Sequence, residues 1–157
     1  MSSAFNNLNN IDLSKISDAT NLKFGIAVSK WNKAITNNLL NGCIDLLKSK
    51  GVIDENIIIS KVPGSFELVY ASKKLQLQDV NSVIAIGSVI RGETMHFDFI
   101  CNATSIGIKD LNVSGKCPVI FCVLTDNNMQ QSVDRSGGKY GNKGSEAAIA
   151  AIEMAII

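Results

Sequence analysis

The chain of 157 residues lacks the features that mark membrane, secreted and nucleic-acid-binding proteins. It has no uninterrupted apolar run of the roughly 20 residues that a membrane-spanning helix needs, and residues 1–23 are rich in Asn, Ser and Asp, unlike a signal peptide. Fifteen basic residues nearly balance fourteen acidic ones without a basic run, so no face is suited to nucleic-acid phosphates. We therefore expect a soluble, cytoplasmic protein with no membrane or nucleic-acid partner.

Metal-ligating side chains are also scarce. The chain has four cysteines: Cys43, Cys101, Cys117 and Cys122. They follow no metal-ligand spacing, and one histidine cannot complete a familiar Cys/His zinc site. We expect most of them to be reduced core residues and the protein to hold no metal. A chain of this length buries roughly 70% of its unfolded surface, which is enough for one domain to fold without disulfides.

Stretches with strand and helix periodicity alternate along the chain. The expected strands are residues 22–29, 57–62, 81–90 and 118–124, and the expected helices are residues 33–50, 66–75, 97–111, about 128–136 and 145–157. This alternation predicts right-handed crossovers and a three-layer α/β/α sandwich of the flavodoxin-like class, with a four-stranded parallel sheet between helices. Residues 22–157 form this domain, and residues 1–21 are an N-terminal segment that is either disordered or pairs with a neighbouring subunit.

Polar and aromatic side chains follow each of the four expected strands, in residues 29–32, 62–67, 91–98 and 124–126. The carboxyl ends of parallel strands share one edge of a sheet, where open α/β folds bind their ligands. We therefore expect an aromatic ring, a carboxylate and the single histidine to meet there.

Two of these side chains suit a planar, hydroxylated ligand. Trp31 offers a flat face for stacking a heterocycle, although it would equally seal the top of the core. Glu67 has oxygens that accept hydrogen bonds from hydroxyl groups, although a carboxylate in the first turn of a helix is favoured by the helix dipole in any protein. Asn32, between these two in the sequence, is placed to cap the helix that begins at residue 33.

The loop before residue 97 predicts an anion site beside a proton-transfer group. Gly92, Glu93 and Thr94 precede a helix, whose free N–H groups bind anions, and they do not form a P-loop. His96 follows, and histidine titrates near neutrality, although a lone histidine is often structural.

A second candidate for anion binding is a group of three cations. Two of them lie in the glycine-rich segment of residues 136–144, and the third directly precedes it. Arg135, Lys139 and Lys143 are suited to clamping a phosphate, but they are also ordinary for a solvated surface, and the segment by itself reads as a flexible connection.

Together, these segments resemble the lumazine synthases, the penultimate enzymes of riboflavin biosynthesis, over about residues 22–155. Five motifs carry the resemblance: Trp31-Asn32, Val62-Pro63-Gly64-Ser65-Phe66-Glu67, Gly87-x-Val89-Ile90-Arg91-Gly92-x-Thr94-x-His96-Phe97-Asp98, Pro118-Val119-Ile120-Phe121, and Asp134-Arg135-x-Gly137-x-Lys139-x-Gly141-Asn142-Lys143-Gly144.

The resemblance implies a reaction between two small molecules, without a metal or organic cofactor. 5-Amino-6-(D-ribitylamino)uracil condenses with 3,4-dihydroxy-2-butanone 4-phosphate to give 6,7-dimethyl-8-ribityllumazine, phosphate and water. It also implies that the pyrimidine substrate is bound by Trp31, Asn32, Ser65, Phe66, Glu67, Ser88, Val89, Ile90 and, from a neighbouring subunit, Phe121.

For the second substrate, the resemblance implies that Glu93, Thr94, Arg135 and Lys143 bind the phosphate and that His96 transfers protons. Glu93 then has to point away from the anion and bind through its backbone N–H, because like charges repel. Holding the two reactants together would supply much of the acceleration.

Self-association is a further implication of the resemblance. A pentamer is the minimum expectation, and the short connection at residues 137–144 resembles that of members that build a 60-subunit icosahedral capsid. Riboflavin synthase is a candidate partner.

Three other functions remain open from the residues. A flavin or lumazine carrier would keep Trp31 and Glu67 but would not need Thr94 and Arg135. An archaeal type of riboflavin synthase would have no use for a butanone phosphate site. A structural cage protein would have strand-end residues without a shared ligand.

Overall fold

A four-stranded parallel sheet forms the middle layer of the structure, a computed structural model that describes residues 12–157. The strand order is β2-β1-β3-β4, so β2 and β4 are the edge strands. The strands are β1 (Phe24–Ser29), β2 (Ile57–Val62), β3 (Ser82–Ile90) and β4 (Val119–Asp126). This arrangement confirms the predicted parallel sheet.

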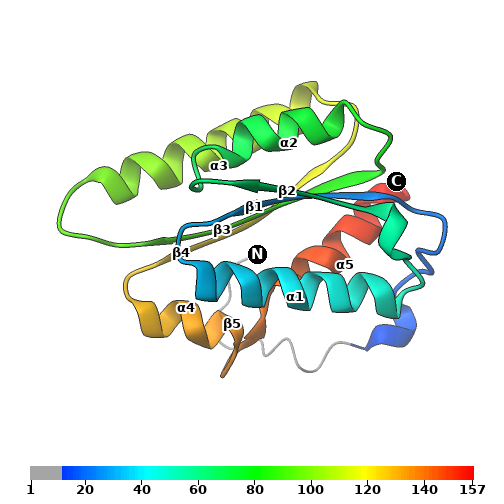
Figure 1. Cartoon of the computed structure of the whole chain (residues 1–157), viewed down its shortest axis with the longest axis horizontal. Helices are drawn as coiled ribbons and strands as arrows, with labels where there is room; N and C mark the ends of the chain where they lie inside the picture. Colours follow the sequence, from blue (N-terminus) through cyan, green and yellow to red (C-terminus); the bar gives the residue numbers. More distant parts are fainter. Residues whose placement is uncertain (1–11) are drawn as a thin grey trace.

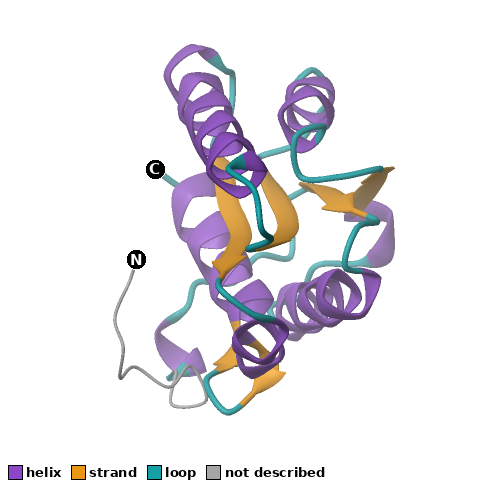
Figure 2. Cartoon of the chain, turned by 90° about the vertical axis from the view of Figure 1, so that its left-hand side faces the viewer, coloured by secondary structure: helices purple, strands orange, loops and turns teal. Residues whose placement is uncertain are grey.

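Helices cover both faces of the sheet (Figures 1 and 2). One face carries α2 (Leu68–Gln76) and α3 (His96–Ser114), and the other carries α1 (Lys33–Ser49), α4 (Met129–Arg135) and α5 (Lys143–Ala155). Successive side chains of a strand point to opposite faces. Accordingly Val83 and Ala85 pack in the core beneath α2 and α3, while Ile84 and Ile86 pack in the core against α1 and α5. The continuous apolar run in residues 82–90 is explained by this burial on both faces.

The glycine-rich segment after α4 is folded into a short hairpin, so of its two interpretations the flexible connection is the one that the structure does not support. β5 (Ser136–Gly138) pairs antiparallel with β6 (Gly141–Asn142). Gly137 has a φ of 115°, in the left-handed region that glycine adopts without a steric penalty. The Asn142 side chain holds the hairpin against α1 by donating to the Asn38 carbonyl over 2.8 Å.

Two helices start earlier than the sequence predicts. α5 begins at Lys143 because the Asn142 side chain accepts from the Gly144 backbone N–H over 2.8 Å, an N-cap interaction. α3 begins at His96, which therefore lies on the first turn of a helix and not on the loop before it.

Part of the predicted N-terminal segment packs against the domain. Residues 1–11 lie outside the described residues, so the prediction for them stays untested. Further along, Ile16 and Ala19 are buried in the core beside α1, and the Ala19 backbone N–H donates to the Lys50 carbonyl over 2.9 Å. The described residues 12–21 are thus tied to the same chain.

All four cysteines are free thiols. Cys43 and Cys122 are buried, and burial raises the pKa of Cys122 to about 12 and that of Cys43 well above its usual value. This agrees with the prediction of reduced core residues for these two, while Cys101 and Cys117 are partly buried. Within residues 12–157, no helix combines the length and hydropathy needed to cross a membrane.

Candidate active site

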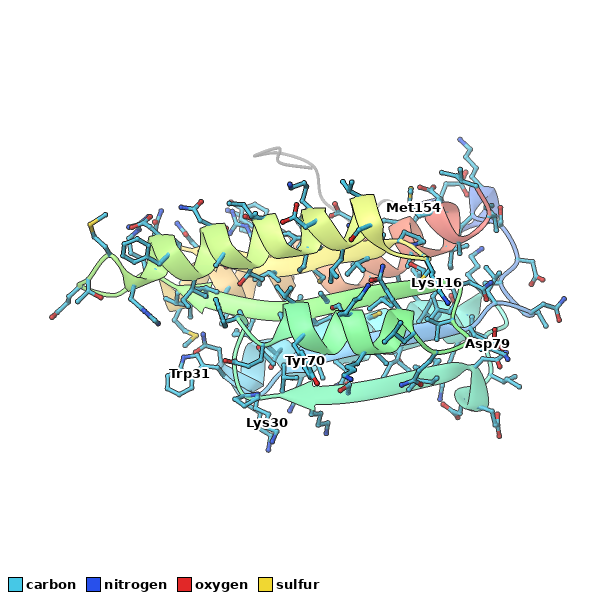
Figure 3. All side chains as sticks on the ribbon, turned by 90° about the horizontal axis from the view of Figure 1, so that it is seen from above. Lys30, Trp31, Tyr70, Asp79, Lys116 and Met154 are labelled. Carbon is cyan, nitrogen blue, oxygen red and sulfur yellow. The ribbon has the colours of Figure 1, made fainter. Side chains whose placement is uncertain are left out.

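The loops that follow the strands stay hydrogen-bonded to one another beyond the sheet. The backbone N–H of Trp31 donates to the Pro63 carbonyl over 3.1 Å, and that of Arg91 donates to the Asp126 carbonyl over 2.9 Å. Figure 3 shows Trp31 at one end of the molecule and Asp79 and Lys116, which precede β3 and β4, toward the other end. The strand-end residues therefore gather at one edge, as expected.

A pocket of about 640 Å³ opens at this edge. It is bounded by the loop after β1, the turn before α2, the end of β3 and the first turns of α3. Its lining residues are Trp31, Gly64, Ser65, Phe66, Glu67, Ser88, Val89, Ile90, Gly92, Thr94, His96, Phe97 and Ile100. The pocket brings together most of the predicted substrate-binding residues with the predicted proton-transfer residue.

Exposed aromatic rings line this pocket. The side chain of Trp31 is 72% exposed and that of Phe66 is 56% exposed. The alternative in which Trp31 seals the core is therefore wrong, since a sealing residue would be buried. Exposed aromatic faces are suited to stacking on a planar ring.

The turn that carries Glu67 is held by hydrogen bonds and by close packing against β3. Glu67 occupies the N-cap position of α2, and its Oε2 accepts from the Gly64 backbone N–H over 2.9 Å. The Ser65 carbonyl accepts from the Thr104 hydroxyl of α3 over 3.3 Å. A side chain at Gly87 would come within 2.7 Å of Ser65 Oγ, so glycine permits β3 to approach this turn closely. Glu67 thus has a structural role, and its Oε1 accepts no hydrogen bond from residues 12–157.

His96 is exposed at the start of α3, beside the predicted anion loop. Its backbone N–H donates to Thr94 Oγ1 over 3.4 Å, and Gly92 and Thr94 line the pocket with it. Ile100 lies one turn later on the same face and adds an apolar wall that the sequence reasoning missed. The helical spacing from His96 was the available signal.

Arg91 fixes the loop between β3 and α3. Its guanidinium donates to both oxygens of Asp98 over 3.3 and 3.1 Å, and its Nε donates to Asn127 over 3.3 Å. It also lies 4.2 Å from the centre of the Phe97 ring. Arg91 is the cation closest in sequence to His96. Because its guanidinium is used in these contacts, Arg91 holds the loop and does not present a free charge. The sequence alone did not predict this role for Arg91.

Two predicted residues lie near the pocket without lining it. Asn32 Nδ2 donates to the Ser88 carbonyl over 3.0 Å, so this side chain joins the loop after β1 to β3. As expected, Asn32 occupies the N-cap position of α1, but its side chain makes no cap hydrogen bond. Glu93 is exposed outside the lining, as required if its carboxylate points away from an anion.

The remaining predicted residues lie elsewhere on the chain. Arg135 ends α4 and Lys143 begins α5, on the face of the sheet opposite α2 and α3 (Figure 1). Arg135 Nη1 donates to the Gln131 carbonyl over 3.0 Å, and Lys143 Nζ pairs with Glu146 over 2.5 Å. Phe121 is 42% exposed on the edge strand β4. None of the three lines the pocket of its own chain.

The described residues offer no cluster of metal ligands. In residues 12–157, no three His, Cys, Asp or Glu side chains are placed to hold one ion. The pocket offers aromatic rings, a carboxylate, hydroxyl groups and an imidazole.

Comparison with known proteins identifies the family. Residues 21–157 match the family model of 6,7-dimethyl-8-ribityllumazine synthase. The relative of that name from Flavobacterium johnsoniae is 59% identical over 96% of this chain and 80% of its own length. Those from Christiangramia forsetii and Porphyromonas gingivalis are 54% and 51% identical, each over 99% of this chain and over 94% and 97% of their own lengths. The chain belongs to the 6,7-dimethyl-8-ribityllumazine synthase family.

Proposed function

We propose that the chain is a transferase that condenses 5-amino-6-(D-ribitylamino)uracil with 3,4-dihydroxy-2-butanone 4-phosphate, releasing 6,7-dimethyl-8-ribityllumazine, phosphate and water. The observation that carries the proposal is the pocket at the strand ends, which places an exposed tryptophan and the only histidine of the chain around one cavity. No cofactor is expected.

The pyrimidine substrate binds at the β1 and α2 side of the pocket. Trp31 and Phe66 supply exposed aromatic faces for its ring. Glu67, whose Oε1 is available, accepts hydrogen bonds from the ribityl hydroxyl groups. Ser88, Val89 and Ile90 lie at the pocket end of β3, where their backbone groups meet the polar edge of the ring. Asn32 supports this strand end through the Ser88 carbonyl.

His96 transfers protons at the other side of the pocket. The substrate amine attacks the ketone and forms an imine with loss of water, phosphate is eliminated, and the resulting enol tautomerises to a ketone. The ribitylamino nitrogen then attacks this ketone, and the ring closes with loss of a second water. Each step moves a proton, and an exposed imidazole at the N-terminus of α3 is suited to accept and return it. Binding both reactants side by side lowers the barrier further.

The phosphate group needs a cation, and no Lys or Arg of residues 12–157 lines the pocket. Gly92, Glu93 and Thr94 supply backbone and hydroxyl donors, but Arg135 and Lys143 lie on the other face of the sheet. We therefore propose that a second copy of the chain supplies Arg135, Lys143 and Phe121, so that each complete site forms between two subunits.

Exposed apolar residues support this self-association. On α3, Phe99, Ile106 and Val113 recur every seven residues and are 66%, 55% and 80% exposed, which forms one apolar stripe along the helix. Large exposed apolar surfaces mark interfaces in most proteins. A pentamer is the proposed unit, and a capsid of twelve pentamers is proposed from the short hairpin connection. The cytoplasmic location and the partnership with riboflavin synthase stay predictions.

The direct test mixes both substrates with the purified protein and follows lumazine fluorescence together with phosphate release. Both signals should rise together, well above the uncatalysed rate, and light scattering on the same sample should give a mass of five chains or a multiple. Binding of the lumazine without turnover would instead indicate the carrier function. Absence of both signals would reject the proposal.

A further inference from the structure

A buried carboxylate at the end of β4 lies beside the proposed phosphate-binding arginine. Asp126 is buried at the last position of β4, and Arg135 ends α4 nine residues later. Asp126 Oδ1 lies 3.9 Å from Arg135 Nε, and Asp126 Oδ2 accepts from the Ser132 hydroxyl over 2.7 Å. The substrate-binding scheme above gives Asp126 no role.

Three groups surround the Arg135 guanidinium. Besides Asp126, the Gln131 carbonyl accepts from Nη1 over 3.0 Å, and the Tyr140 ring centre lies 5.2 Å from Cζ. No hydrogen bond joins Nη2 to any residue in the range 12–157. The side chain is 34% exposed, so one edge of the guanidinium is held within the chain while another stays available.

The burial of Asp126 distinguishes this pair from the surface ion pairs of the chain. Its side chain is 8% exposed, whereas Asp79, which pairs with Lys23, is 92% exposed. Exposed pairs contribute little because water screens them, but a buried carboxylate needs a nearby cation or hydrogen-bond donors. Asp126 and Arg135 are therefore mutually constrained in a way that Lys23 and Asp79 are not.

We infer that Asp126 is a positioning residue that orients Arg135 toward the phosphate of the second substrate, an inference that rests on the proposed function. α4 has only seven residues, and a helix this short is not stable by itself, so its contacts with the rest of the fold, among them the Ser132 hydrogen bond to Asp126 of β4, determine where its last side chain points. Holding the guanidinium in advance reduces the entropy lost when the anion binds.

The test compares Asp126→Asn with Asp134→Asn. Asparagine keeps an oxygen for the Ser132 hydroxyl and removes the charge. Asp134 lies on α4 next to Arg135 but accepts from Gln130 over 2.8 Å, so its substitution changes net charge equally without touching the guanidinium. We expect Asp126→Asn to raise KM for the butanone phosphate roughly fivefold, with kcat and KM for the pyrimidine within about twofold. Asp134→Asn should leave all three within about twofold.

A double substitution shows whether the effect passes through Arg135. In an Arg135→Ala background, Asp126→Asn should have no further effect on KM for the butanone phosphate. An unchanged KM in the single variant, or the same rise in both backgrounds, would overturn the inference. If Arg135→Ala by itself leaves this KM unchanged, the proposed phosphate site fails first.

Melting temperatures of every variant show that the comparison is made between folded proteins. If Asp126→Asn does not fold, Ser132→Ala serves as the second variant, because it removes one support of the carboxylate and keeps its charge. It should raise the same KM about twofold and leave KM for the pyrimidine unchanged. A rise in both constants would overturn the inference.

Discussion

The functional side chains are held differently at the strand-end pocket and in the cationic region, which consists of Arg135 and Lys143 on the opposite face of the sheet. Around the pocket, Trp31 and His96 are exposed, and the His96 imidazole forms no ion pair within residues 12–157. In the cationic region, Arg135 lies beside Asp126, and Lys143 is paired with Glu146. The pocket is thus open to ligands, while the cations are held by their own chain.

This difference indicates a site divided between copies of one chain. A pocket for a phosphorylated substrate is incomplete without a free cation, and neither Arg135 nor Lys143 lines the strand-end pocket of its own chain. Joining the two regions of neighbouring subunits supplies what each lacks, and the exposed apolar residues Phe99 and Phe121 provide surface for that contact.

Of the substitutions that test this comparison, Arg135→Ala should have the largest effect on the kinetic constants. A guanidinium that binds phosphate makes charge-assisted hydrogen bonds, so its loss should raise KM for the butanone phosphate about 100-fold. Steady-state kinetics with each substrate varied in turn measures this. Lys139→Ala is the control, since Lys139 lies 5.3 Å from the same Tyr140 ring but is not among the residues proposed to bind the phosphate in the complete site. Equal effects of the two substitutions would contradict a specific role for Arg135.

His96→Ala should lower kcat by roughly 10- to 100-fold, because proton transfer contributes to several steps but approximation of the reactants persists. KM for both substrates should change little. Met95→Ala, at the exposed neighbouring position, is the matched control. A kcat equal to that of the control would remove His96 from the mechanism.

Trp31→Ala should raise KM for the pyrimidine substrate about tenfold through lost stacking, and Trp31→Phe should restore most of the affinity. Tyr70 is a suitable control, because it is 68% exposed but does not line the pocket. If Tyr70→Ala and Trp31→Ala weaken binding to the same extent, the pocket does not select the ring through Trp31.

Arg91→Lys should have the smallest effect, lowering kcat roughly threefold to fivefold. Lysine keeps the charge but cannot donate to Asp98 and Asn127 with the planar geometry of arginine, so the loop before His96 loses its fixed position. Asp98→Asn should resemble it, and the two changes combined should be less than additive. Full additivity in kcat would show that the two residues act separately.

Much of the pocket could be predicted from the sequence because parallel strands place their carboxyl ends together. The apolar run at residues 82–90 and the polar residues after it were sufficient to place His96 near Trp31. The location of Arg135 was not predictable in this way. It depends on which face of the sheet α4 covers and on the burial of Asp126, which are long-range properties.

The hairpin at residues 136–142 shows the same limit. Its glycines indicate a turn, but its position is set by a hydrogen bond from Asn142 to the Asn38 carbonyl of α1, about a hundred residues earlier. Local pattern cannot reveal such a contact. The same reason explains Asn32, which stands at the N-cap of α1 as predicted but whose side-chain amide donates to the distant Ser88 carbonyl and makes no cap hydrogen bond.

Subunit complementation tests the divided site most directly. A Trp31→Ala/His96→Ala chain lacks the pocket functions and an Arg135→Ala chain lacks the cation, so the two are co-expressed, co-purified and assayed at low butanone phosphate. If each site takes its pocket from one copy and its cation from another, random assembly restores about a quarter of the sites, and activity should far exceed that of either variant. An activity equal to the average of the two separate variants, in particles shown to contain both chains, would contradict the account.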